Sequence, residues 1–125
     1  AGLEVPEGAD RYEGLAVAVK PAEGELVIEK SAPSAFQGTP LSFHLTGLGV
    51  DTVIVCGETT SGCIRASVVD GATHRFKMTV VEECVFDRTE ASHWMNLYDM
   101  HQKYADVIDR HEAAAYFEQV SARKK

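Results

Sequence analysis

The sequence predicts an α/β fold, in which helices alternate with the strands of a parallel sheet. Short apolar runs rich in β-branched residues recur along the chain, and the clearest of them, residues 51–57, is apolar nearly throughout and too short for a helix. Segments with apolar residues at helical spacing follow these runs. Strands that alternate with helices return the chain to the same end of the sheet by right-handed crossovers, so the strands run parallel.

Composition predicts one globular domain with a modest core, since 45% of the 125 residues are hydrophobic and 25% are charged. A net charge of -7 argues against nucleic acid or an anionic membrane as the main partner. No apolar run approaches the roughly eighteen residues of a transmembrane helix, and no signal-peptide pattern opens the chain. The three cysteines lack CxxC spacing and fit a reducing compartment, so we expect a cytoplasmic protein.

The first elements are separated by glycine and proline. Residues 1–23 contain several of both and are predicted to be an irregular leading segment, whereas residues 24–125 form the folded portion. A strand is expected over 25–30, where apolar residues precede a serine- and proline-containing stretch. A helix follows over 39–48, with Thr39 as its N-cap and a proline at its first position.

The remaining elements continue the alternation. After the strand at 51–57, the spacing predicts a helix over 61–73 whose apolar stripe packs on the sheet. Another strand is expected over 76–85. A long helix is then predicted over 89–110, and a last helix over 112–121.

Three histidines on the predicted long helix raise the question of a metal site. His93, His101 and His111 are eight and ten residues apart, which does not bring their rings within reach of one ion on a straight helix. They are therefore interpreted as surface or packing residues, and no metal or cofactor is predicted. Cys56, in the middle of a strand, is interpreted as an inert core residue.

Cys63 is the residue most suggestive of chemistry. It follows a buried strand and the polar turn Gly57–Gly62, which places it on the first turn of the next helix. Unpaired backbone N–H groups and the positive end of the helix dipole favour a thiolate there, and hence a nucleophile. The alternative is that Cys63 is a small buried apolar residue and that Thr59, Thr60 and Ser61 cap the helix.

Ligands bind beyond the carboxyl ends of parallel strands, and three predicted strands end in useful groups at that rim. Lys30 ends the first, the turn to Cys63 follows the second, and Asp87 with Arg88 follows the third. A lysine beside the cysteine would stabilise the thiolate, and an arginine suits a substrate carboxylate. Backbone N–H groups of the turn could hold an oxyanion, which points to acyl or amide chemistry, although Lys30 and Arg88 are also ordinary surface residues by type.

Three motifs in order carry a resemblance to a known family. They are Val27-Ile28-Glu29-Lys30 with SAFQGT at 34–39, GETTSGC at 57–63 with Arg65-Ala66-Ser67, and CVFDR at 84–88. With these motifs the chain resembles the isochorismatase-like cysteine hydrolases over roughly residues 24–118, within the branch of N-carbamoylsarcosine amidase and maleamate amidohydrolase. The resemblance implies a Rossmann-like, three-layer fold with helices on both faces of the sheet.

The resemblance also implies a reaction, in which a cysteine hydrolyses a C–N amide bond of a small carboxylated amide or ureido compound through a thioester and releases ammonia. Carried onto this chain, Cys63 is the nucleophile and Lys30 the lysine of the catalytic triad. The peptide bond that precedes Thr59 is expected to be cis, and the N–H groups of Thr59 and Cys63 form the oxyanion hole. Thr60 touches the substrate or braces the hole, and Arg88 grips the substrate carboxylate.

The chain departs from the family in one respect. The family's catalytic aspartate lies at the end of a strand far upstream of the lysine, and nothing in residues 1–23 matches that segment. The apolar strand 51–57 also calls for a neighbour on each side. The chain is therefore expected to be the C-terminal half of the domain, with a companion chain or N-terminal half supplying the aspartate, and the complete domain is expected to form homo-oligomers. The alternatives are a catalytically inactive binding or interaction module, and a redox sensor.

Overall fold

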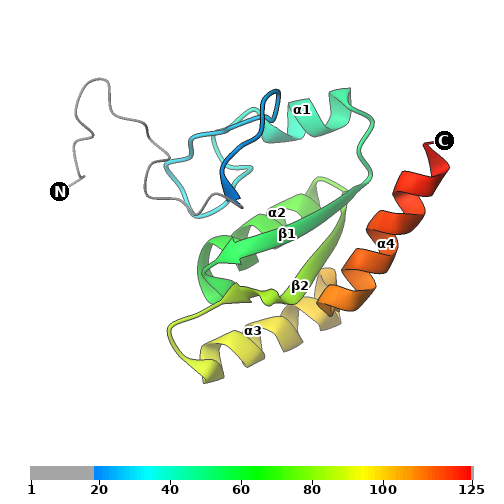
Figure 1. The fold of residues 1–125 in the computed structure, drawn as a ribbon. Helices are drawn as coiled ribbons and strands as arrows, with labels where there is room; N and C mark the ends of the chain where they lie inside the picture. Colours follow the sequence, from blue (N-terminus) through cyan, green and yellow to red (C-terminus); the bar gives the residue numbers. More distant parts are fainter. Residues whose placement is uncertain (1–18, 125) are drawn as a thin grey trace.

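The computed structural model describes residues 19–124. The irregular segment predicted over 1–23 therefore lies largely outside the described residues. A parallel sheet forms the centre, with β1 (Thr52–Glu58), β2 (Lys77–Phe86) and β3 (Ala105–Ile108) in the order β1-β2-β3 (Figure 1). Both strand pairs are parallel, as the sequence predicts.

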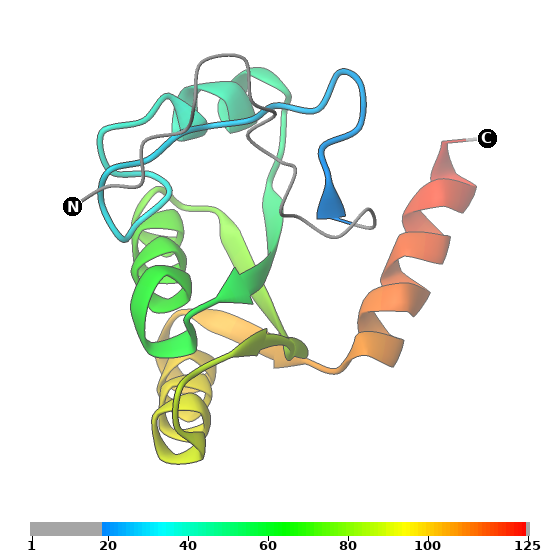
Figure 2. The same ribbon diagram turned by 60° about the vertical axis from the view of Figure 1, so that its left-hand side comes forward.

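Helices lie on both faces of this sheet. Helices α2 (Arg65–Thr73) and α3 (Glu90–Lys103) cover one face, and α4 (Arg110–Arg123) lies on the other side (Figure 2). Helix α1 (Leu41–Gly47) precedes β1 and falls within the predicted helix 39–48. The α/β prediction with a parallel sheet is thus confirmed. No helix within residues 19–124 is long and apolar enough to cross a membrane.

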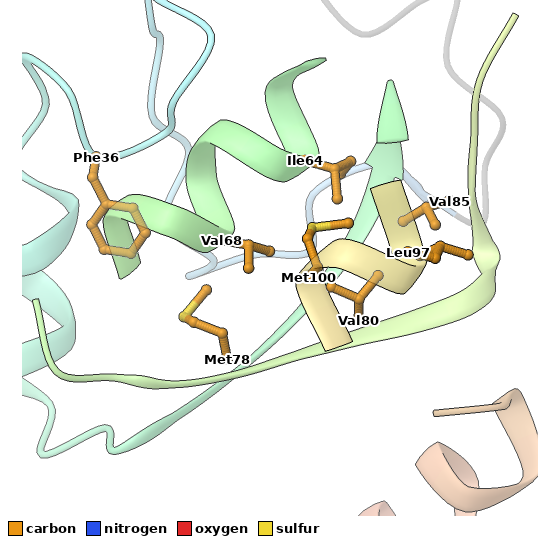
Figure 3. Close-up of a cluster of buried hydrophobic side chains, with 8 residues drawn as sticks. All are labelled: Phe36, Ile64, Val68, Met78, Val80, Val85, Leu97 and Met100. Atoms are coloured by element: carbon orange, nitrogen blue, oxygen red, sulfur yellow. The ribbon is translucent and has the colours of Figure 1, made fainter. Parts of the chain in front are cut away.

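The hydrophobic core lies between the sheet and helices α2 and α3. Val68, Val80 and Met100 have no accessible surface, so α2, β2 and α3 meet at the centre of this core. Figure 3 shows the eight buried residues of the cluster, which include Phe36 from the segment before α1. A core built from residues of β2 and its two covering helices gives the carboxyl ends of the strands a fixed support.

The strand predicted over 25–30 is wrong. These residues form no regular secondary structure, although their apolar composition favours a strand. A strand exists only where its backbone pairs with a neighbour, and the three-stranded sheet of the described residues does not include this segment. Leu26 and Val27 are accordingly 53% and 46% exposed.

The single helix predicted over 89–110 is also wrong. Helix α3 ends at Lys103, and β3 follows at once and pairs with β2, so that Val80 lies opposite Val107 and Val81 opposite Ile108. Asp109 then begins α4 with a capping box that it forms with Glu112. The predicted helix 112–121 is therefore the central part of the longer α4.

Cys56 is not the core residue that its position in a strand predicts. Its side chain is exposed because the β1–β2 register is irregular between Val55 and Gly57, and β1 pairs with no strand of the described residues on its other edge. Gly57 has a φ of 123°, which a residue with a side chain rarely adopts. Desolvation by the atoms around the sulfur, and then the neighbouring Cys84, raise the pKa of Cys56, although the residue as a whole is exposed.

Candidate active site

Cys63 lies in a tight irregular turn between β1 and α2. The peptide bond between Glu58 and Thr59 is cis, and the wide helical turn η2 (Thr60–Ile64) follows. The Thr59 carbonyl accepts hydrogen bonds from the N–H groups of Gly62 (2.9 Å) and Ile64 (3.2 Å), so the chain closes around that oxygen. Gly62 departs from helical geometry, with φ -108° and ψ -107°.

This geometry corrects two details of the prediction. The regular helix begins at Arg65, so Cys63 lies in the turn before it and not on its first turn. The side chain of Thr59, the residue that precedes η2, caps nothing. The hydroxyl of Thr60 instead lies 2.9 Å from Nδ1 of His93, and Ser61 uses its backbone N–H toward Asp87. The turn is therefore held by contacts that residues distant in the sequence supply.

The structure brings Lys30 and Cys63 together. The Lys30 Nζ lies 3.4 Å from the Cys63 Sγ and also donates a hydrogen bond to the Ala32 carbonyl at 3.1 Å. Cys63 is half-buried, whereas Lys30 is exposed. An ammonium group at this distance stabilises negative charge on the sulfur, and the half-buried position of the thiol weakens the screening by water.

Asp87 joins the end of β2 to the same turn. One carboxylate oxygen accepts the Ser61 N–H at 2.8 Å, and the other accepts the N–H of Arg88 at 2.7 Å. Hydrogen bonds from Ser61, from its side chain first and its backbone second, lower the pKa of the Asp87 carboxyl from its ordinary value. Because both carboxylate oxygens of Asp87 accept backbone hydrogen bonds, the side chain holds the turn in place.

A cavity of about 300 Å³ is lined by Lys30 and Cys63 and by residues 53–58 along the open edge of β1. The side chain of Arg88 is exposed and does not line this cavity. The predicted contact of Arg88 with a substrate carboxylate therefore stays a prediction.

Two roles were predicted for Thr60, contact with the substrate and support of the oxyanion hole. Its side chain has no accessible surface among the described residues, which argues against contact with a substrate, and its hydroxyl lies 2.9 Å from Nδ1 of His93. The second role, in which Thr60 braces the oxyanion hole, stays a prediction. His93 is the residue that sequence reasoning missed. Its spacing from the other histidines indicated only a surface or packing residue, and 33 positions separate it from Thr60. No group of metal-ligating side chains that could hold an ion is found within residues 19–124.

The family model for the isochorismatase domain matches residues 4–112 of this sequence. The chain belongs to the isochorismatase family. The match begins before residue 24, so it includes most of the segment that the sequence predicts to be irregular.

Two curated relatives of this isochorismatase-family chain are amidohydrolases by name. The chain is 50% identical over 96 residues to maleamate amidohydrolase of Pseudomonas putida, a match that covers 77% of the chain and 45% of the relative. It is 39% identical over 100 residues to N-carbamoylsarcosine amidase of an Arthrobacter species, which covers 80% of the chain and 38% of the relative. The chain thus spans less than half the length of these relatives.

A solved structure supports the same family fold. The isochorismatase family protein from Desulfovibrio vulgaris matches with a TM-score of 0.74 and 30% identity, over 86% of this chain and 54% of that one. The sheet and helices described above are therefore a substantial part of an isochorismatase fold.

Proposed function

We propose that this chain carries the cysteine and lysine of an amidohydrolase that hydrolyses the C–N bond of a small carboxylated amide or ureido compound. The observation that carries the proposal is the 3.4 Å contact between the Lys30 ammonium and the Cys63 sulfur, in a chain of the isochorismatase family. The names of the two curated relatives make maleamate and N-carbamoylsarcosine the first substrates to test.

In the proposed reaction, an aspartate takes the Cys63 thiol proton and the sulfur attacks the amide carbon. The N–H groups of Thr59 and Cys63 donate to the oxyanion that forms, and Lys30 stabilises the negative charge near the sulfur. The C–N bond then breaks, and the nitrogen takes the proton and leaves as ammonia. Water hydrolyses the thioester, which releases the carboxylic acid and restores the thiol; with a ureido substrate the intermediate is a thiocarbamate and the product a carbamic acid.

We further propose that the aspartate comes from outside the described residues, from an N-terminal half of the domain or a companion chain. The open edge of β1 supports this, because the strand pairs only with β2 within residues 19–124. Val53 and Val55 on this strand are only partly buried. Half-exposed apolar residues beside an unpaired strand edge suit an added strand. We also propose that the completed domain forms homo-oligomers.

Ammonia release tests the assignment of the nucleophile. The assay uses this chain together with the N-terminal half or companion chain that supplies the aspartate. In that complex, Cys63→Ala is expected to abolish the release of ammonia from maleamate and from N-carbamoylsarcosine. Cys84→Ala is the matched control and is expected to keep the wild-type rate, because Cys84 is exposed and does not line the cavity. Activity that survives the loss of Cys63 would show that the nucleophile is another residue.

Alkylation separates this proposal from an inactive binding module. An activated Cys63 is expected to react with iodoacetamide faster than glutathione does at the same pH. Cys56 and Cys84 provide internal references in the same chain. If Cys63 reacts no faster than glutathione and no ammonia is released, the chain is the inactive module.

A further inference from the structure

The His93 imidazole links the start of α3 to the turn that presents Cys63. Its Nδ1 lies 2.9 Å from the hydroxyl oxygen of Thr60, which has no accessible surface. A buried hydroxyl without a partner destabilises the fold, and this contact supplies the partner. Thr60 opens η2 only three positions before Cys63, so a displacement of Thr60 moves the backbone that carries the sulfur.

Helix α3 is a firm support for this contact. Leu97 and Met100 fix the helix in the core, with 3% and no exposure respectively. Arg65, two positions after the cysteine, donates hydrogen bonds from one guanidinium nitrogen to Asn96 (2.7 Å) and Asp99 (3.2 Å) of the same helix. Helix α3 thus holds the chain on both sides of Cys63, through His93 before it and through Arg65 after it.

The lysine lacks such support. Lys30 is exposed and belongs to a segment without regular secondary structure. Of the two partners in this contact, the cysteine is therefore the one whose position the packing against α3 fixes. Asp87 also holds this turn, because its carboxylate accepts the Ser61 N–H at 2.8 Å, and His93 adds a second support through the fully buried hydroxyl of Thr60.

We propose that His93 is a positioning residue for the cysteine: it holds the Thr60 hydroxyl, and through it the turn, so that the Cys63 sulfur stays beside Lys30. This inference rests on the proposed function, because it concerns the reactivity of the same thiol. His93 acts through Thr60 and touches neither the sulfur nor the substrate.

Four variants remove or keep this one contact. His93→Leu removes the nitrogen, and Thr60→Val removes the hydroxyl while it keeps the shape of the side chain. His93→Asn is the matched control, because the asparagine amide places a hydrogen-bonding atom at the position of Nδ1. The double variant His93→Leu with Thr60→Val tests whether the two side chains act as a unit.

The measurement is the rate at which iodoacetamide alkylates Cys63. Cleavage after glutamate releases each cysteine on its own peptide, because glutamates stand at positions 29, 58, 82, 83 and 90. His93→Leu and Thr60→Val are expected to slow Cys63 about tenfold each, the effect of losing one buried hydrogen bond. The double variant is expected to be no slower than either single one, and His93→Asn to stay within about twofold of wild type.

Each result decides between positioning and a purely structural role. If His93→Leu and Thr60→Val lower the melting temperature but leave the Cys63 rate unchanged, the contact is structural and the inference is overturned. Failure of His93→Asn to restore the rate overturns it as well. Thr60→Val keeps the test open if His93→Leu does not fold. Failure of the proposed function differs, because wild-type Cys63 would then react no faster than glutathione.

Discussion

The cysteine and the lysine of the candidate site lie in two regions that are built differently. Cys63 belongs to a turn backed by the core, where Val68 and Met100 have no accessible surface. Lys30 ends a segment without regular secondary structure, in which Leu26 and Val27 are about half exposed. The packing of this chain therefore fixes the sulfur, whereas few contacts fix the ammonium.

The two regions are joined by a short stretch after Lys30. The Ala35 N–H donates to the Ser67 hydroxyl of α2 at 2.9 Å. Phe36 enters the core with 7% exposure, and its ring stacks on Phe76 at 6.0 Å between centroids. These contacts dock the lysine segment on α2, the helix that follows the cysteine, so the approach of Lys30 to Cys63 follows from this docking.

The largest expected effect tests the difference in packing. Met100→Ala is expected to lower the free energy of unfolding by about 2–5 kcal/mol, because it opens a cavity at a site without accessible surface. Val27→Ala, in the lysine region, is expected to change it by no more than about 0.5 kcal/mol. Urea denaturation of both variants measures this. Equal losses would show that the two regions are packed equally well.

Removal of the lysine charge is expected to affect chemistry and not stability. Lys30→Met should slow alkylation of Cys63 by roughly tenfold to a hundredfold, since a hydrogen bond to a charged group contributes about 1.5–3 kcal/mol. The urea midpoint should stay unchanged. Lys77 is also an exposed lysine, but it lies at the amino end of β2, away from the candidate site. Lys77→Met is therefore the control and should leave the rate of Cys63 alkylation unchanged. An unchanged alkylation rate in Lys30→Met would show that the Lys30 ammonium does not contribute to the reactivity of the Cys63 thiol.

A smaller effect tests the contact between α2 and the sheet. A Cβ at Gly71 would collide with the Sδ and Cε atoms of Met78 and lie 3.1 Å from the Phe36 ring, so Gly71→Ala should destabilise the protein by about 1–3 kcal/mol. Gly47→Ala in α1 meets no atom within 4 Å and should stabilise by up to about 1 kcal/mol. Thermal unfolding compares the two, and a neutral Gly71→Ala would mean that the Met78 side chain moves aside freely.

The smallest effect concerns pH. The pKa of Asp87 is lowered in the folded protein by its hydrogen bonds from Ser61. The carboxylate therefore contributes stability above the unfolded value of about 3.9, and this contribution is lost as pH falls through the lower folded value. Asp87→Asn should melt slightly below wild type at pH 7, and the gap should close toward pH 2. A gap that stays constant with pH would show that the charge of Asp87 adds nothing.

The sequence alone determined the central part of the fold. The apolar, β-branched runs at 51–57 and 76–85 predict strands that the structure contains as β1 and β2, and the residues between them supply the helix α2. The motifs around Lys30 and Cys63 predicted that these two residues meet, and the structure places them in contact. Local patterns suffice for the strands and the turn, because a long apolar run or a glycine-rich turn restricts the backbone by itself, whereas the meeting of Lys30 and Cys63 was predicted from the family resemblance.

The tertiary structure decided the rest, since strands and side-chain contacts depend on neighbours that are distant in the sequence. Residues 25–30 have the composition of a strand and form none, whereas the four residues of β3 form one because β2 lies beside them. The contact of His93 with Thr60 joins residues 33 positions apart, and no local pattern of spacing signals it. Only the packing of α3 against the turn brings that imidazole to the hydroxyl.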